Sequence, residues 1–232
     1  MLSTLLSGRF TMQEIIAQIL ASLMVIFLIL PFHEWAHAFT ASCLGDKGIR
    51  QRGRLSLNPL SHIDPIGALM LLLVGFGWAK PVPVDPRYFK NPKLGRAITA
   101  LMGPVANIVA ALVGLIVYKL IYFNVPAWFF ASQSMAQASV LWYFLTFYVN
   151  INISLAVFNL IPIPPLDGSK VMFLFLPDRA VNFFYRYQNI FFLALFMLIM
   201  SGAMSGVLSV LTGWLTNGLN WLASLPFRPF IG

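Results

Sequence analysis

Cysteine and charge are both scarce in this sequence. The single cysteine among its 232 residues, Cys43, excludes an internal disulfide and any zinc site built from several cysteines. Charged residues make up 9% of the chain and hydrophobic residues 59%, a balance far from that of soluble domains. We therefore expect a membrane protein, much of whose surface faces lipid.

Acidic residues are scarcer than basic ones, and the formal net charge is +8. The basic residues lie in short loops between apolar stretches, where membrane proteins carry the signal for their orientation. The positive charge therefore does not indicate nucleic-acid binding. The first apolar run continues to about Leu44 without a small-residue cleavage pattern, so we expect a retained membrane helix and not a removed signal peptide.

Apolar stretches long enough to cross a bilayer, which takes about 20 residues, recur along the chain. A sixth stretch of only thirteen residues, 66–78, fits a re-entrant segment as well as a span. The sequence thus predicts an all-α polytopic membrane protein of one domain (1–232) with five to six transmembrane helices, a core of about residues 14–176 and a C-terminal helical hairpin of about residues 183–224. The predicted spans are residues 15–44, 98–123, 138–160, 183–200 and, with more polar residues, 204–224.

The loops on both sides of residues 66–78 are basic, with four positive residues in 46–64 and five in 80–96. By the positive-inside rule both loops face the cytoplasm, so the piece between them should enter and leave the membrane on one side. The same rule predicts an outside linker at 124–137, an outside N-terminus and an inside C-terminus. Prolines in GIRQRGRLSLNP and AKPVPVDP favour extended chain, which with residues 66–78 predicts a short membrane-associated re-entrant or β element.

Residues 33–37, HEWAH, place ionisable groups inside the first apolar run. Residues four apart share one face of an α-helix, so His33 and His37 can direct two imidazoles at one metal ion while Glu34 lies beside them to transfer protons. The alternative is a chance match in which the histidines are packed or hydrogen-bonded for structural reasons. Because ionisable side chains in an apolar helix are costly and usually functional, the pattern favours a metal site.

Catalytic zinc usually has three protein ligands, so a third must come from elsewhere in the chain. The candidates are His62, the five aspartates and Glu14. Ligand chemistry favours His62, but depth favours Asp167. At about 1.5 Å per helical residue, His33 lies about 17 Å from the basic end of its helix, and Asp167 and Asn107 lie about 15 Å from the same side in two other spans.

Asp167 belongs to an unusual stretch, FNLIPIPPLDGSK, whose prolines at 162, 164 and 165 prevent a regular helix. A helix end followed by a solvated turn would explain this composition. The other interpretation is a helix that unwinds inside the membrane and presents Asp167 to a cavity. The presence of HEWAH in another span favours the second interpretation.

Several motifs occur together and in order. HEWAH at 33–37, GPVAN at 103–107 and NLIPIPPLDG at 159–168 resemble the site-2 protease family of intramembrane zinc metalloproteases, peptidase family M50. NPLSHIDPIG at 58–67 and GWAKPVPVDP at 77–86 are similar to its compact bacterial-type branch, which has neither a PDZ nor a CBS domain. The resemblance covers about residues 30–175.

The resemblance implies one zinc ion held by His33, His37 and Asp167, with Glu34 as general base and acid. It also implies that Asn159 lies near the catalytic centre and helps to bind the substrate or the oxyanion. Asn107 is a further candidate for such a contact, and the structural alternative for it is a hydrogen bond between packed helices.

The expected activity is that of a zinc metalloendopeptidase that hydrolyses peptide bonds in or near transmembrane segments, either in regulated proteolysis or in the clearance of signal-peptide remnants. Its expected partners are a membrane-protein substrate and the bilayer, and its expected place is a bacterial cytoplasmic membrane with the active site open to the cytoplasm. Two rivals are a zinc transporter, which would leave Glu34 without a task, and a membrane scaffold, which would need no metal.

Overall fold

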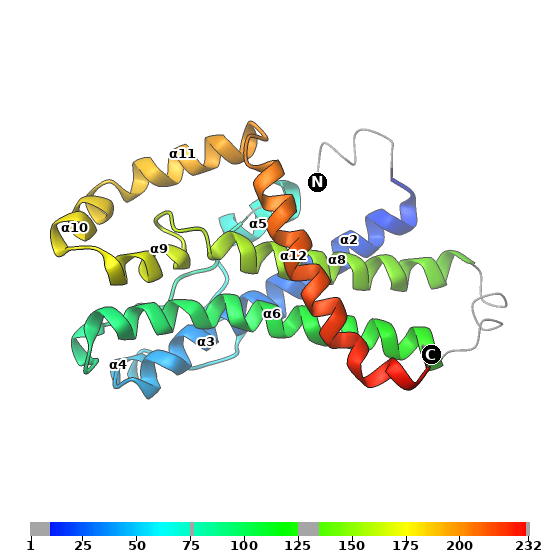
Figure 1. Cartoon of the computed structure of the whole chain (residues 1–232), viewed down its shortest axis with the longest axis horizontal. Coiled ribbons are helices and arrows are strands. Elements are labelled where there is room, and N and C mark those ends of the chain that lie inside the picture. The colour runs from blue at the N-terminus through cyan, green and yellow to red at the C-terminus, as the bar shows by residue number, and fades with distance from the viewer. Residues whose placement is uncertain (1–9, 75–76, 125–134, 231–232) are drawn as a thin grey trace.

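The first membrane helix is one continuous rod whose hydrogen-bonding pattern changes from α to π and back to α. The computed structural model describes residues 10–74, 77–124 and 135–230, and its first rod comprises α2 (Met12–Met24), the π-helical turn η1 (Val25–Ile29) and α3 (Leu30–Cys43) (Figure 1). Thr11 and Glu14 cap the start with reciprocal hydrogen bonds. Pro31 explains the π turn, because it has no N–H for the carbonyl of Phe27 and its ring would collide with that carbonyl in a regular α-helix.

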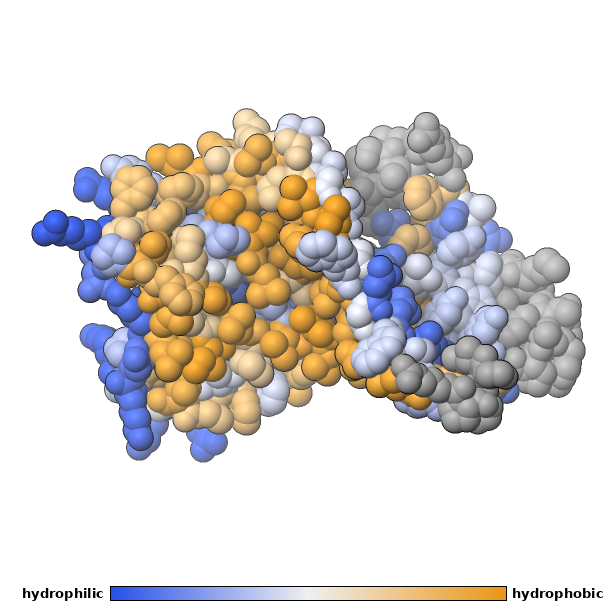
Figure 2. Space-filling view, viewed as in Figure 1, coloured by the Kyte–Doolittle hydropathy of each residue, from blue (hydrophilic) through white to orange (hydrophobic). Residues whose placement is uncertain are grey.

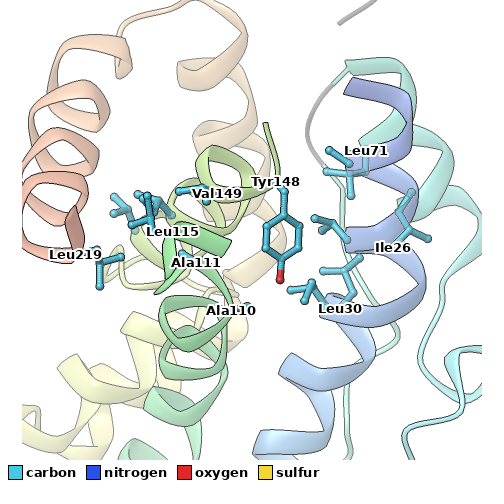
Figure 3. Packing of buried hydrophobic residues seen from close by; sticks show 14 of the residues in the cluster. Ile26, Leu30, Leu71, Ala110, Ala111, Leu115, Tyr148, Val149 and Leu219 are labelled. Atoms are coloured by element: carbon cyan, nitrogen blue, oxygen red, sulfur yellow. The ribbon is translucent and has the colours of Figure 1, made fainter. Parts of the chain in front are cut away.

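Two further long helices complete the centre of the molecule, α6 (Pro92–Asn124) and α8 (Met135–Asn159). α2 packs against α8 and α3 packs against α6. Their shared core includes Ile26, Ala111, Leu115 and Tyr148, and α12 adds Leu219 to it (Figure 3). This packing fixes α3 and α6 side by side, which is what brings HEWAH next to GPVAN.

The C-terminal third is a series of shorter helices. Residues 160–166 after α8 are irregular, as the three prolines predict. α10 and α11 meet at an angle of 66°. The elements are α9 (Asp167–Met172), η4 (Phe173–Phe175), α10 (Asp178–Arg186), α11 (Gln188–Met200), α12 (Ser205–Ser224) and η5 (Leu225–Phe230).

Three described helices are long and apolar enough to cross a membrane, namely Met12–Cys43, Pro92–Asn124 and Ser139–Asn159, and the bent pair of α10 and α11 counts as a fourth. The protein is therefore an integral membrane protein. Figure 2 shows apolar residues over much of the molecule and hydrophilic residues at the end that carries α4 (Gly48–Gln51), the start of α6 and α10. The predicted count of five to six spans is higher than this, since α12 is polar at several positions and is not a candidate span.

The C-terminal end of the chain lies on the opposite side from the one predicted. α11 has 13 residues and is only about 20 Å long, too short to cross a hydrocarbon core of about 30 Å. After the turn at 201–204, α12 continues towards the end where α6 finishes, and Phe227 stacks on Phe123 with ring centroids 5.3 Å apart (Figure 1). The predicted return to the basic side is thus wrong, because the end of α12 leads to the end of α6 that is remote from the basic loops.

The described part of residues 66–78 turns back to its starting point. α5 (Pro65–Val74) has ten residues, and the chain then comes back so that Ile63 bridges to Ala79 and Lys80 N donates to His62 O at 2.7 Å. A side chain at Gly67 would collide with the carbonyl of Trp78, so glycine is required for this close approach. The chain therefore leaves this segment beside the point where it enters it, as a re-entrant piece would.

The predicted β element is absent from the described residues, which contain one isolated bridge, Ile63 to Ala79, but no strand. GIRQRGRLSLNP instead forms the short helix α4, an irregular stretch and the start of η2 (Pro59–Ser61). AKPVPVDP is extended up to η3 (Pro86–Tyr88), but its prolines lack N–H groups, and two of its remaining N–H groups donate to carboxylates. This segment therefore makes hydrogen bonds to carboxylates in place of the backbone hydrogen bonds of a paired strand.

Two predictions fall on residues outside the described ranges. Of the linker at 124–137 only Asn124 and the residues from Met135 onwards are described, and the N-terminal tail is described only from Phe10.

Candidate metal centre and active site

Three buried side chains meet where α3, α6 and α9 come together. His37 Nε2 lies 3.1 Å from His33 Nε2 and 3.1 Å from Asp167 Oδ2, and His33 Nε2 lies 3.3 Å from Asp167 Oδ2. These residues are only 6–8% exposed. The predicted convergence of HEWAH with Asp167 is confirmed, and it forms the group of His, Cys, Asp and Glu ligand atoms among the described residues that could hold a metal ion.

The spacing of the three atoms suits a zinc ion. With zinc–nitrogen bonds of 2.0–2.1 Å, ligands at tetrahedral angles lie about 3.3 Å apart, close to the 3.1–3.3 Å between these atoms. Two imidazoles and a carboxylate are also a common ligand set for catalytic zinc. The residues present therefore fit one zinc ion.

Each of these side chains uses its other polar atom to contact a neighbour. His33 Nδ1 lies 2.6 Å from Asn107 Oδ1, and His37 Nδ1 lies 2.7 Å from the Thr99 carbonyl oxygen. A carbonyl oxygen only accepts hydrogen bonds, so the proton of His37 lies on Nδ1 and its Nε2 lone pair faces the centre. Two nitrogens and a carboxylate oxygen facing one point would repel one another unless a cation lay between them.

Asp167 is the first residue of α9 and follows the irregular proline segment. Gly168 makes this fold possible, because a side chain there would collide with the Leu160 carbonyl at the end of α8. Lys170 Nζ lies 2.8 Å from Asp167 Oδ1, on the oxygen that does not face the histidines. The aspartate is thereby oriented with Oδ2 towards His33 and His37.

α6 presents a glycine to the centre. A Cβ atom at Gly103 would lie 2.4 Å from His37 Nε2 and 2.5 Å from His33 Nε2, too close for any side chain. Gly103 therefore lets α6 approach the histidines themselves. The sequence gave GPVAN only as part of a family resemblance and did not indicate which groups its glycine contacts.

Glu34 lies beside the histidines on α3 and is 8% exposed. Its Oε2 accepts a hydrogen bond at 3.0 Å from the backbone N–H of Val82, which belongs to the extended AKPVPVDP segment. The carboxylate thus bridges the helix that carries the histidines and the loop that follows the re-entrant segment. One oxygen is held in place, and the group lines the same cavity as the histidines.

A cavity of about 640 Å³ opens at the centre. It extends from the histidines past the extended segment to the corner between α10 and α11. Its lining is mainly apolar, with a few polar groups at the histidines and at the α10–α11 corner, as is usual for a binding site. The lining includes Glu34, Trp78, Val82, Asn159, Lys170 and Gln188.

The two asparagines predicted to act at the site both line the cavity but have different partners. Asn159 lies at the end of α8, and its Nδ2 donates to Leu155 O at 3.0 Å. Asn107 is fully buried and contacts His33 and Asn152, so its amide makes the kind of interhelical hydrogen bond that the sequence gave as the alternative to a substrate contact. Asn152 is likewise fully buried.

His62 does not join the group. Its imidazole is completely buried, and its Nε2 lies 2.6 Å from Ser56 O. The aspartates of the basic loops also lie elsewhere, as expected from their depth: Asp64 caps α5 and Asp85 pairs with Arg87.

Sequence reasoning missed two partners of the centre. Lys170 is not among the predicted residues, although its spacing of three residues from Asp167 is a signal for contact on a helix. The Thr99 carbonyl left no signal, since every residue carries the same backbone oxygen.

The profile of peptidase family M50 matches residues 21–202. The putative zinc metalloprotease YwhC of Bacillus subtilis is 39% identical over 152 residues, which are 64% of this chain and 67% of that protein.

Two mycobacterial proteins named putative zinc metalloprotease Rip2 also match. That of Mycolicibacterium smegmatis is 33% identical over 141 residues, 59% of this chain and about half (49%) of the relative's length. That of Mycobacterium tuberculosis H37Rv is 28% identical over 202 residues, 83% of this chain and 69% of the relative. No solved structure matches the chain significantly.

Proposed function

Because the chain belongs to peptidase family M50 and is a zinc metallopeptidase, we propose that it hydrolyses peptide bonds in or next to transmembrane segments of other membrane proteins. The observation that carries this proposal is the buried triangle of His33, His37 and Asp167 on membrane helices, with Glu34 beside it in a cavity of about 640 Å³. A site at this place can meet a peptide bond only if the substrate also lies in or at the membrane.

We assign the metal ligands as His33 Nε2, His37 Nε2 and Asp167 Oδ2. Bound there, a zinc ion would supply Lewis acidity and a water molecule whose pKa lies near neutrality. Asn107, the Thr99 carbonyl and Lys170 orient the three ligands from outside.

We assign Glu34 as the group that takes up the proton of the attacking water and later delivers it to the leaving amine. Its Oε2 is held by Val82 N, which leaves Oε1 for proton transfer. Asn159 is proposed to meet the substrate carbonyl oxygen. One N–H of its amide donates to Leu155 O, and the other can donate to an oxyanion in the cavity.

A substrate helix has its peptide groups hydrogen-bonded internally, so it must unwind locally before a carbonyl can reach the centre. Helix-breaking or polar residues in the substrate span should therefore favour cleavage. By the positive-inside rule, the basic loops favour a cytoplasmic location for the end of the molecule that carries them. The relatives are bacterial, and we propose a bacterial cytoplasmic membrane with the site reached by water from the cytoplasm.

The test compares the wild type with Glu34→Gln after reconstitution with single-span membrane peptides. The chain's other glutamate, Glu14, is half-buried and caps α2 far from the metal ligands in the sequence, so Glu14→Gln is a matched control. Glu34→Gln should retain zinc and lose cleavage, while Glu14→Gln should retain both. Unchanged cleavage in Glu34→Gln would refute the assignment of the base, and zinc binding without cleavage of any membrane peptide by the wild type would favour a metal-binding or transport role.

A further inference from the structure

The extended residues 79–85, AKPVPVD, form one wall of the cavity without belonging to a sheet. Pro81, Val82 and Val84 line the cavity. Val82 and Val84 also pack against a small core formed by Ala38, Ala41, Ile49 and Phe89. We call these residues the 79–85 segment.

The backbone of the 79–85 segment is held by two carboxylates of the first membrane helix and the turn after it. Val82 N donates to Glu34 Oε2 at 3.0 Å, and Asp85 N donates to Asp46 Oδ2 at 2.8 Å. Pro81 and Pro83 have no N–H to donate. A shift of the segment by one residue would place a proline opposite Glu34 and break this hydrogen bond.

Asp46 is the carboxylate that binds Asp85 N, at the second point where the 79–85 segment is held. Its side chain is completely buried, and besides Asp85 N it accepts hydrogen bonds from Gly48 N at 3.0 Å and from Arg52 Nη2 at 3.3 Å. A buried carboxylate is costly unless such donors compensate for the lost water. The proposed chemistry does not use this group, so the cost calls for another explanation.

Arg52 joins the carboxylate to the 79–85 segment a second time. Its Nη2 donates to Pro83 O at 2.9 Å while it pairs with Asp46. Asp46 and Arg52 therefore hold both the N–H of Asp85 and the carbonyl of Pro83, at the end of the segment remote from Glu34.

We propose that Asp46 and Arg52 are positioning residues that tether the 79–85 segment in the register in which Val82 N–H orients Glu34. The inference rests on the proposed function of Glu34, but the tether itself concerns only the folded chain. Neither residue touches the metal ligands, so their role is to place the general base and the cavity wall.

Hydrogen exchange measured by mass spectrometry on the full-length protein tests the tether. The 79–85 segment has five exchangeable amides, those of Ala79, Lys80, Val82, Val84 and Asp85. Asp46→Asn replaces one carboxylate oxygen, which accepts hydrogen bonds, by an amide N–H₂, which cannot accept them. Arg52→Ala removes the hydrogen bond to Pro83 O. Both should speed exchange in this segment by about tenfold, whereas Arg50→Ala, an exposed arginine on the neighbouring helix α4, should not.

Kinetics on the same variants test the link to Glu34. Cleavage of a single-span membrane peptide should fall about tenfold to a hundredfold in kcat, with little change in KM and with the zinc content of the wild type. Arg52→Lys should lie between Arg52→Ala and the wild type, because lysine keeps the positive charge but has a shorter side chain without the fixed planar donors of the guanidinium.

Wild-type exchange rates in the 79–85 segment of both variants would refute the tether. Faster exchange with unchanged kcat would refute the orientation of Glu34. If Asp46→Asn exchanges fast along the whole chain because it fails to fold, Arg52→Ala decides, since the Arg52 side chain is 41% exposed. A wild type that cleaves no membrane peptide would refute the proposed function, while the exchange comparison would still decide the tether.

Discussion

The Nδ1 atom of His33 lies 2.6 Å from Oδ1 of Asn107, and this contact starts a chain of hydrogen bonds with a single direction. Asn107 Nδ2 donates to Asn152 Oδ1 at 3.3 Å, and Asn152 Nδ2 donates to the Tyr148 carbonyl at 2.8 Å. Because a backbone carbonyl can only accept, each amide must turn its oxygen towards the previous member. The proton of His33 is thereby placed on Nδ1, and Nε2 is left to bind metal.

Asn152→Leu should weaken zinc binding although Asn152 touches neither the metal ligands nor the cavity. Without an acceptor at position 152, the Asn107 amide can turn its N–H₂ towards His33 and oppose the tautomer that binds metal. We expect a loss of about tenfold to a hundredfold in zinc affinity, the usual effect of removing a partner of a metal ligand, measured by chelator competition. Asn150→Leu, at an exposed position on the same helix, is the control, and equal affinities in the two variants would contradict the prediction.

Gly103→Ala should abolish zinc binding. Its Cβ would lie 2.4–2.5 Å from the two Nε2 atoms, and either the histidines or α6 must move. Gly213 on α12 has open space around the same position, so Gly213→Ala tests the general effect of alanine in a helix. Zinc content and helical circular dichroism should separate the two variants, and full zinc occupancy in Gly103→Ala would show that the packing of α6 is wrong.

Asp167→Ala should lose zinc, whereas His62→Ala should keep it. Asp167 Oδ2 faces both histidines, while the buried His62 imidazole bonds to Ser56 O. His62→Ala should instead lower the free energy of unfolding by about 1–3 kcal/mol through a lost buried hydrogen bond and a cavity. Metal analysis and thermal unfolding distinguish these effects. The opposite pattern, with zinc lost in His62→Ala alone, would overturn the third ligand.

Asp85 should titrate far below an ordinary aspartate. Its hydrogen bonds to the Arg87 guanidinium lower the pKa of this carboxyl from 3.8 to about 2. A pKa lowered by folding means that the pair stabilises the folded loop above pH 3.8, and that this stabilisation is lost as the pH falls towards 2. Arg87→Ala should raise the pKa of Asp85 towards 3.8, measured by NMR of ¹³C-labelled aspartate side chains. Arg50→Ala should leave it unchanged, and an unshifted pKa in Arg87→Ala would mean that the pair does not form.

The meeting of His33, His37 and Asp167 could be predicted because it depends on properties visible in a sequence. Four-residue spacing fixes a helix face, a fixed rise per residue converts position into depth, and three prolines mark the place where a helix unwinds. The bilayer strengthens this prediction, because ionisable groups are costly in an apolar environment and those at one depth can pair with one another.

Other features depend on tertiary contacts that no local pattern encodes. Whether AKPVPVDP pairs with a strand or with carboxylates depends on where Glu34 and Asp46 lie after folding. Whether α11 crosses alone depends on the 66° bend that precedes it and on the turn that follows. The Thr99 carbonyl has no residue signature, and Gly103 is informative only when the histidines opposite it are in place.

Because of the π turn at Val25–Ile29, the two halves of the first membrane helix turn their buried faces in different directions. α2 directs its buried face to α8, and α3 directs HEWAH to α6 and Asp167. Deleting one residue from this turn would keep the length and hydrophobicity of the rod almost unchanged, yet it would rotate one half against the other by about 100°. The rotation between the two halves of the first membrane helix thus depends on the number of residues in this turn, which the composition of the helix does not reveal. A single-residue deletion there should misalign the histidines as thoroughly as replacing them.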